Sequence, residues 1–215
     1  MSEGRRRVFL LSPANAGGER AKMLLRPEAG FDLAVRLRRE GVPLGEAFGF
    51  ISGLYFRGKL AYSERFARPP EGVPGAFVIT SGSGLAPPNT ILTAEDLRRI
   101  ASIPIDAGDV RYREPLDRAC RILDEIAGSD CDIVLLGSVA TVKYLEPMFA
   151  VFGERLLFPS EFIGRGDMSR GGLLLRCARA GTELEYTPVG SVTRHGQRPP
   201  KLPKLRTRYA EREES

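Results

Sequence analysis

The chain has 215 residues with 42% apolar content, 27% charged content and a formal charge of +5, values typical of a globular protein that buries a substantial core. No apolar run is long enough to span a membrane, and the run behind the basic N-terminus breaks at Pro13, so we expect a cytoplasmic protein without a signal peptide or membrane contact. The cysteines, Cys120, Cys131 and Cys177, lack the spacing of a zinc site or a disulfide framework and are interpreted as buried apolar residues.

Strands and helices are predicted to alternate along the chain. Short apolar runs are typical of strands buried on both faces, and they occur at residues 8–11, 76–80, 131–136 and 154–159, with a further strand through Tyr186. Segments that favour helices lie at residues 19–25, 31–39, 44–67, 93–101, 114–128 and 138–149. Thr93 and Asp96 match an acidic form of the capping box, and the segment 44–67 is expected to divide near Gly53 or Gly58.

This alternation predicts an α/β fold, a three-layer α/β/α sandwich with a central, mainly parallel sheet. Its core is expected to contain the middle residues of the apolar runs, namely Phe9, Leu10, Val78, Ile79, Val134, Leu135 and Leu157. We expect one α/β domain over residues 1–191 and a basic, Pro-rich tail over residues 192–215.

Loops rich in small residues follow three of the predicted strands, with the sequences SPANAGG, SGSGLAPPNT and GSVAT. The carboxyl ends of parallel strands meet at one edge of a sheet, so these loops are expected to line one crevice for a ligand. The candidate ligand-binding residues in them are Asn15, Ser81, Ser83, Asn89 and Ser138. No GxGxxG spacing and no P-loop lysine is present, so we predict no nicotinamide or ATP site, no metal and no other cofactor.

Three segments resemble known sequences. DIVLLGSVATVKYL is similar to a strand and helix of the uracil-DNA glycosylase-like superfamily, and FPSEFIGRGDMSRGG resembles the late loop of that superfamily, whose usual form begins His-Pro-Ser. LYFRGKLAYSERFA followed by AFVITSGSGLAPPNT is similar to small bacterial domains of unknown function related to the same fold. Together these segments cover residues 8–189, and the resemblance implies an α/β sandwich that acts on nucleobases or nucleic acid.

The chain departs from the glycosylase pattern at two positions. Phe158 stands where the pattern has histidine, and it can neither donate a proton nor bond to a developing base anion. In the first loop the family often has an acidic residue or an asparagine that positions water, and this chain offers only Asn15. An asparagine orients water or binds a base edge but is a poor general base. Ordinary uracil excision is therefore not predicted.

The late loop combines glycines with cations. Arg165 and Arg170 offer bidentate forks for a phosphate, Ser160 and Ser169 add hydroxyl groups, and the glycines allow close backbone approach. Asp167 is a candidate acid or base, or it holds one of the arginines. The alternative is a structural loop in which Asp167 pairs with an arginine and caps a helix that starts near Ser169.

The tail after Val192 carries most of the net charge. Its candidate nucleic-acid-binding residues are Arg194, Arg198, Lys201, Lys204 and Arg206. A second basic cluster, Arg5, Arg6 and Arg7, opens the chain. A tail that only increases solubility is the alternative.

Two hypotheses follow. The first is a nucleic-acid- or nucleotide-associated enzyme that acts on a nucleobase or nucleoside in the crevice, with Asn15 and Asp167 as its catalytic candidates. The second is a non-catalytic module that binds nucleic acid or a nucleotide. Asn15 and Asp167 at one shared pocket would favour the enzyme, whereas a flat basic face with both turned away would favour the module.

Overall fold

The apolar runs form the strands of a central sheet. The computed structural model describes residues 5–138 and 142–191, and within them six strands pair in the order β4-β3-β1-β6-β7-β8. The strands are β1 (Arg6–Leu11), β3 (Ala76–Thr80), β4 (Gly84–Ala86), β6 (Cys131–Leu136), β7 (Leu156–Pro159) and β8 (Tyr186–Pro188). The four inner strands run parallel, and β4 and β8 join the edges antiparallel, which confirms the predicted mainly parallel sheet.

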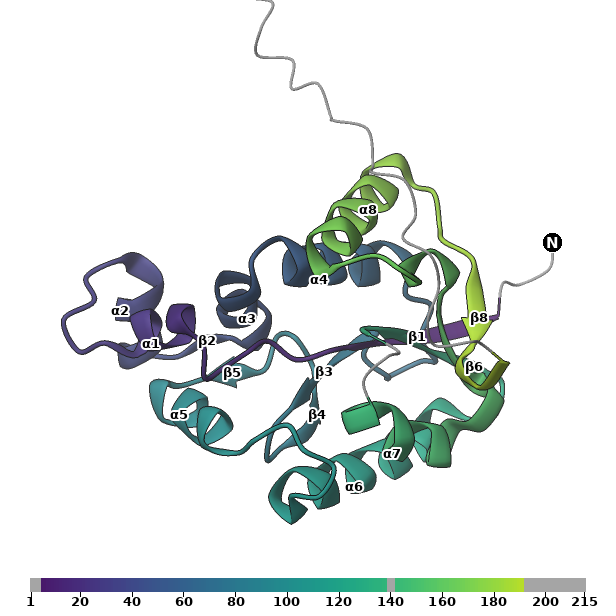
Figure 1. Ribbon diagram of the computed structural model, residues 1–215, viewed down its shortest axis with the longest axis horizontal. Helices are drawn as coiled ribbons and strands as arrows, with labels where there is room; N and C mark the ends of the chain where they lie inside the picture. The colour runs from purple at the N-terminus through teal and green to yellow at the C-terminus, as the bar shows by residue number, and fades with distance from the viewer. Residues whose placement is uncertain (1–4, 139–141, 192–215) are drawn as a thin grey trace, which may run out of the picture.

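Helices cover both faces of the sheet. In Figure 1, α4 and α8 lie on one face and α6 and α7 on the other, as a three-layer sandwich requires. The described helices are α1 (Glu19–Leu25), α2 (Asp32–Arg39), α3 (Leu44–Ser52), α4 (Leu54–Phe66), α5 (Ala94–Ser102), α6 (Val110–Ala127), α7 (Val142–Phe152) and α8 (Asp167–Ala180), with short 3-10 turns η1 (Gly153–Arg155), η2 (Ser160–Phe162) and η3 (Val189–Ser191). None of these helices is long and apolar enough to cross a membrane.

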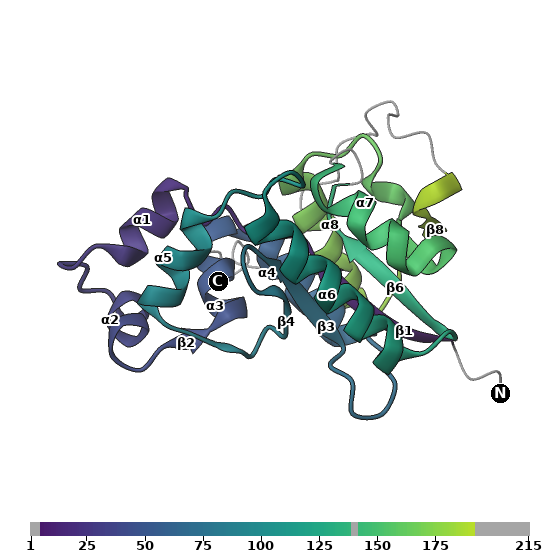
Figure 2. The same cartoon turned by 90° about the horizontal axis from the view of Figure 1, so that it is seen from below.

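The carboxyl ends of the parallel strands point toward a group of smaller elements. Figure 2 shows α1, α2, α3 and α5 gathered beyond this edge of the sheet, together with β2 (Val42–Pro43). There β2 pairs antiparallel with β5 (Ile91–Leu92). These elements lie next to the carboxyl edge of the sheet, which is the edge where ligands bind in open α/β sheets.

The core matches the predicted strand centres with one exception. Phe9, Leu10, Val78, Ile79, Val134 and Leu135 are fully buried. Leu157 is only half-buried, because its side chain points to the opposite face of β7 from the fully buried Leu156 and Phe158.

The predicted capping box and the predicted break between two helices are both present. Thr93 and Asp96 make the predicted capping box at the start of α5, and α3 and α4 meet at Gly53, whose φ is 59°. The segment expected to be an irregular loop after β3 instead contains β4. Gly82 and Gly84 have φ values of 83° and 68°, so the chain reverses tightly enough for β4 to pair with β3.

The late glycine-rich segment is more helical than expected. Of its glycines, Gly164 has a positive φ of 70°, whereas Gly171 lies inside α8. A Cβ at Gly171 would lie 2.7 Å from Tyr55 Cα, and one at Gly58 would lie 2.7 Å from the Gly171 carbonyl oxygen. These two glycines therefore serve close packing of α4 against α8.

Candidate functional site

A cavity of about 400 Å³, here called the lysine cavity, opens at the carboxyl edge of the sheet. Its polar lining comes from separate elements: Ser12 and Asn15 follow β1, Tyr55 and Lys59 lie on α4, Tyr144 on α7 and Asp167 on α8. The predicted crevice therefore exists, and it holds both residues named from sequence as catalytic candidates, Asn15 and Asp167.

Lys59 lies at the floor of the lysine cavity. It belongs to the buried stripe of α4 that also contains Tyr55, Tyr62 and Phe66, and its residue is only 1% exposed. Its Nζ donates to the Ser12 carbonyl oxygen at 2.6 Å and to the Ser12 Oγ at 3.0 Å. The rings of Tyr55 and Phe56 lie 4.6 and 4.7 Å from the nitrogen and exclude water from that side.

Burial changes the acid–base behaviour of this amine. Loss of hydration lowers the pKa of Lys59 to about 7 from 10.5, although the negative charge of Asp167 acts in the opposite direction. Near neutral pH a large fraction of the amine is therefore unprotonated. An unprotonated lysine is a nucleophile and a base, which an ordinary surface lysine is not.

Ser12 is held firmly in place for this contact. Its backbone N–H donates to the Leu136 carbonyl oxygen at 3.2 Å, which extends the ladder between β1 and β6 by one bond. The side chain is buried, at 7% exposure of the residue. The position of the Lys59 amine is thus set by the sheet itself and not by a mobile loop.

Tyr55 adds a buried hydroxyl to the same site, and the nearby Arg170 guanidinium acts on it. The residue is 7% exposed, and its Oη is buried without a hydrogen-bond partner of good geometry among the described residues. Burial raises the pKa of Tyr55, so the group keeps its proton and remains a donor. Buried hydroxyl groups are normally bonded, and an unbonded one at a cavity wall indicates a place for a ligand acceptor.

Asp167 reaches the lysine cavity because α8 packs tightly on α4. Gly171 is one helical turn after Asp167, and Gly58 directly precedes Lys59, so the glycine contact brings the start of α8 over the amine. The Asp167 side chain is 72% exposed and lies 3.5 Å from Arg170 Nη1. It therefore lines the lysine cavity while its carboxylate remains open to solvent.

Ser138, which follows β6, and Tyr144 on α7 also line the lysine cavity. The Tyr144 hydroxyl donates to the Ser138 carbonyl oxygen at 3.1 Å and accepts from the Ser138 N–H at 3.2 Å. Ser138, a predicted ligand-binding residue, consequently lies at the cavity wall.

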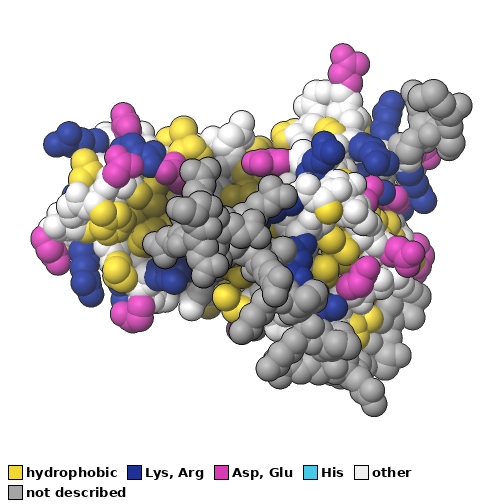
Figure 3. Space-filling view, turned by 90° about the horizontal axis from the view of Figure 1, so that it is seen from above, with side chains coloured by type: hydrophobic (Ala, Val, Ile, Leu, Met, Phe, Trp, Pro, Cys, Tyr) yellow, Lys and Arg dark blue, Asp and Glu magenta, His cyan; other side chains and the backbone are white. Residues whose placement is uncertain are grey.

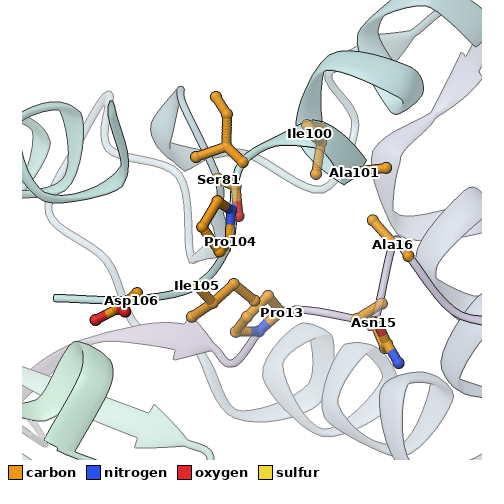
Figure 4. A pocket seen from close by; sticks show the side chains of 12 residues that line it. Pro13, Asn15, Ala16, Ser81, Ile100, Ala101, Pro104, Ile105 and Asp106 are labelled. Carbon is orange, nitrogen blue, oxygen red and sulfur yellow. The ribbon is translucent and has the colours of Figure 1, made fainter. Parts of the chain in front are cut away.

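A second cavity of about 470 Å³ adjoins the first and shares Pro13, Asn15 and Ile105 with it. Figure 4 shows Ser81 and Pro104 on one side of this space and Asn15 on the other, with the amide of Asn15 pointing away from Ser81. Much of its remaining wall is apolar, including Ile100. The loops after β1 and β3 thus line the second cavity together. The loops after β1 and β6 line the lysine cavity.

Two other predicted ligand-binding residues lie elsewhere. Ser83 lines a separate groove beside α6, and Asn89 is exposed and lies outside these three cavities. Both follow β3, but the tight turn into β4 carries the chain away from the edge that holds Lys59. The predicted single crevice is therefore two adjoining cavities without these residues.

The late-loop arginines bond mainly to their own segment. Arg165 donates to the Glu161 carbonyl oxygen at 2.8 Å and to the Ser169 Oγ at 3.3 Å. Arg170 donates to the Phe162 carbonyl oxygen at 3.1 Å and lies over the Phe162 ring. Neither arginine lines the lysine cavity, and this arrangement is the structural loop that the sequence left open as an alternative.

Ser160 also bonds locally, through its Oγ, to the Glu161 carboxylate at 3.2 Å and the Glu185 carbonyl oxygen at 3.5 Å. It lies at η2, between β7 and α8, and does not line the lysine cavity. Within the described ranges, no three His, Cys, Asp or Glu side chains are grouped so as to hold a metal ion.

Of the two basic segments singled out from the sequence, the structure describes the N-terminal one and none of the tail. The predicted nucleic-acid-binding residues lie in the tail, outside the described residues: Arg194, Arg198, Lys201, Lys204 and Arg206. At the N-terminus Arg7 is buried in an ion pair with Glu183, and Arg5 pairs with Asp132 at 3.1 Å. On the face with α4 and α8, the coloured part of Figure 3 shows basic and acidic side chains interspersed.

The chain matches no protein-family model, and no curated protein or solved structure is significantly similar to it. The functional argument accordingly depends on the geometry of the site.

Lys59, Tyr55 and Tyr144 were not among the residues selected from sequence. One signal could have identified the first of them: residues 55, 59, 62 and 66 follow helical spacing, so Lys59 interrupts an otherwise apolar stripe. A lysine in such a stripe must be buried or must disrupt the helix packing. No comparable pattern identifies Tyr144.

Proposed function

We propose that the protein is an enzyme that acts on a nucleobase or nucleoside bound in the lysine cavity. The observation that carries this proposal is Lys59, a buried amine with a pKa of about 7 at the floor of a cavity at the carboxyl edge of the sheet. Groups with pKa values matched to neutral pH are concentrated at catalytic sites, because proton transfer and nucleophilic attack both require them.

The other cavity groups suit a polar heterocyclic substrate. Tyr55 supplies a hydrogen-bond donor, and Asn15 supplies both a donor and an acceptor for a base edge. The volume of about 400 Å³ lies in the range of small-molecule sites. The resemblance of residues 132–145 and 158–172 to the uracil-DNA glycosylase-like superfamily supports the choice of a nucleobase or nucleoside.

The proposed roles follow from position. Lys59 reacts with the substrate, Tyr55 donates to a substrate oxygen, and Asp167 moves protons between the cavity and solvent. Asn15 binds and orients the substrate through its amide. It does not act as an acid or a base.

A binding panel tests the proposal. Free bases, nucleosides and short oligonucleotides would be added to the full chain and to Tyr55→Phe, with the melting temperature as the readout. We expect a base or nucleoside to raise the melting temperature of the unmodified chain, and Tyr55→Phe to lose about tenfold in affinity, the value of one hydrogen bond at about 1.4 kcal/mol.

Two outcomes would contradict the proposal. One is the absence of any shift with bases and nucleosides at millimolar concentration. The other is binding of oligonucleotides alone with equal affinity in both proteins, which would show a non-catalytic nucleic-acid-binding module that does not use the lysine cavity.

A further inference from the structure

We infer that Lys59 is a nucleophile that forms an imine with an aldehyde or ketone carbonyl of the substrate. The inference rests on the proposed function, because it assigns a reaction to the cavity proposed there as the active site. An intact nucleoside has no free carbonyl at C1′. The sugar presents one, in its open-chain form, after water has cleaved the bond to the base and the base has left.

The contacts of the Lys59 amine leave its lone pair available. A neutral amine has two N–H bonds and one lone pair, and the two acceptors on Ser12 lie 2.6 and 3.0 Å from Nζ. Both N–H bonds are therefore directed at Ser12. The remaining position of the nitrogen is the lone pair, and Lys59 forms part of the cavity lining.

The surroundings of Lys59 lack the carboxylate that a buried charged lysine ordinarily has. Among the described residues no carboxylate lies within ion-pair distance of its Nζ, and Asp167 pairs instead with Arg170. The faces of two aromatic rings lie against Nζ and offset only part of the cost of burying a charge there. A buried cation without a bonded carboxylate is costly, whereas a neutral amine in the same place is not.

Lys59, Tyr55 and Asp167 supply the nucleophile, the hydrogen-bond donor and the proton carrier that imine formation needs. The Nζ lone pair forms a bond to the carbonyl carbon, and the electrons of the C=O π bond move to oxygen, which accepts a hydrogen bond from Tyr55. Two protons then pass from the nitrogen to this oxygen, relayed by water and by the Asp167 carboxylate that lines the cavity. The first gives the hydroxyl group of the carbinolamine, and the second lets that group leave as water while the C=N bond forms. The products are the imine and one water molecule, and addition of water reverses the step without an oxidant or reductant.

Trapping with a small aldehyde tests this inference on the full chain. Propionaldehyde and sodium cyanoborohydride at pH 7 alkylate a lysine through its imine, and peptide mass mapping gives the rate at each lysine. Lys22 is the internal control, because its side chain is 63% exposed and pairs only with Glu19 across one turn.

We expect alkylation of Lys59 to be faster than that of Lys22 by about tenfold or more. At pH 7 an ordinary lysine is neutral in only about one molecule in 2,500, an advantage for Lys59 that burial reduces but does not cancel. Asp167→Asn should slow alkylation at Lys59 several-fold and leave Lys22 unchanged. Lys59→Arg, which keeps a cation but cannot form the imine, should leave the other lysines unchanged.

The dependence on pH separates a catalytic amine from a structural one. The titratable groups that line the lysine cavity with Lys59 are Tyr55 on α4, Tyr144 on α7 and Asp167 on α8. The rate at Lys59 should level off above about pH 8, because its amine is then fully neutral. A structural lysine that keeps its proton would show no such plateau.

Alkylation of Lys59 no faster than that of Lys22, or only after unfolding, would overturn the inference. Nucleoside binding without this reactivity would refute the imine and leave the proposed function intact. Rapid alkylation without nucleoside or base binding would support the nucleophile and reject the proposed substrate.

Discussion

Lys59 combines two features that proteins ordinarily keep apart, an ionisable amine and nearly complete burial without a paired carboxylate. It is 1% exposed and lies against two aromatic rings, yet its nitrogen is at the wall of a cavity. A methionine of similar length would fill the same space at lower cost. A lysine at this position is consequently best explained by the chemistry of its amine.

The stability of the Lys59→Met variant should reveal this cost through its dependence on pH. The folded pKa of about 7 lies below the ordinary value of 10.5, so between these values the unfolded chain binds a proton that the folded chain lacks. The free energy of unfolding then rises with pH over that interval. Methionine does not titrate, so the stability of the unmodified chain relative to Lys59→Met should increase by about 2 kcal/mol from pH 7 to pH 9.

Urea denaturation at pH 6, 7, 8 and 9 would measure both proteins. Below about pH 6 the difference should be constant, because Lys59 is then protonated in both states. A difference that did not change across the whole range would mean that Lys59 keeps an ordinary pKa in the folded protein.

Tyr55 and Tyr62 form a matched pair for a second prediction. The Tyr55 hydroxyl lies near Arg170 but makes no hydrogen bond of good geometry among the described residues, so Tyr55→Phe should change the free energy of unfolding by less than about 1 kcal/mol. The Tyr62 hydroxyl accepts from the Leu184 N–H at 2.8 Å and lies 2.7 Å from the Tyr186 hydroxyl, so Tyr62→Phe should lose about 1–2 kcal/mol. Equal losses in chemical denaturation would show that Tyr55 is bonded within the protein and does not await a ligand.

The sequence predicted some of the residues that line the lysine cavity and missed others. Asn15 and Asp167 could be selected because they lie in loops at the ends of predicted elements, where polar residues are conspicuous. Lys59 could not be selected in the same way, because its importance comes from burial, and burial depends on how α4 packs against α8 and the sheet. Arg170 was selected for its charge, but its contacts are to the carbonyl and ring of Phe162.

The crossing of α4 and α8 positions the site at the level of elements. Gly58 and Gly171 let the two backbones approach without side chains between them. This contact places the first turn of α8 beside the lysine cavity, so the geometry of Asp167 relative to Lys59 depends on it.

Gly171→Ala should therefore affect both stability and the site. Its Cβ would lie 2.7 Å from Tyr55 Cα and 2.9 Å from the Leu54 carbonyl oxygen, which are backbone atoms that cannot move aside easily. We expect a loss of about 1–3 kcal/mol in the free energy of unfolding and slower alkylation of Lys59. Gly166→Ala is the control, because a Cβ there meets no atom within 4 Å. Similar behaviour of the two variants would exclude a special role for the crossing.

The elements themselves were predictable to different degrees. The inner strands follow from short apolar runs, since few other structures bury every residue of such a run. The edge strand β4 was missed because it consists of Gly84, Leu85 and Ala86 within a segment rich in turn residues. Only its pairing with β3 makes it a strand.

At the scale of the whole molecule, the parallel sheet explains why distant segments meet in one place. Residues that follow β1 and β6 converge because neighbouring parallel strands end at the same edge, and α4 and α8 supply the remaining groups. The alternation of strands and helices was sufficient to predict a cavity at this edge. It was insufficient to predict two adjoining cavities, because their walls depend on how the segment from α5 to α6 folds over the edge.

The charge distribution makes a separate prediction for nucleic acid. Residues 192–215 hold seven Lys or Arg against three Glu, whereas Arg5 and Arg7 are engaged in ion pairs. If the proposed partner is nucleic acid, removal of residues 192–215 should weaken oligonucleotide binding and reduce its dependence on salt. Fluorescence anisotropy at several salt concentrations would measure this. Unchanged affinity after truncation would mean that the tail is not a nucleic-acid-binding arm.

The central claim is that the Lys59 amine is neutral in a large fraction of molecules near pH 7, and a direct titration of that amine tests it. The lysine side chains would be labelled with ¹³C at Cε and followed by NMR from pH 5 to pH 11, with Lys59→Arg used to assign the signal. We expect a midpoint close to pH 7 for Lys59, well below the value of an ordinary lysine. A midpoint above pH 10 for Lys59 would contradict the account, because the residue would then be a permanently charged structural group and not a catalytic amine.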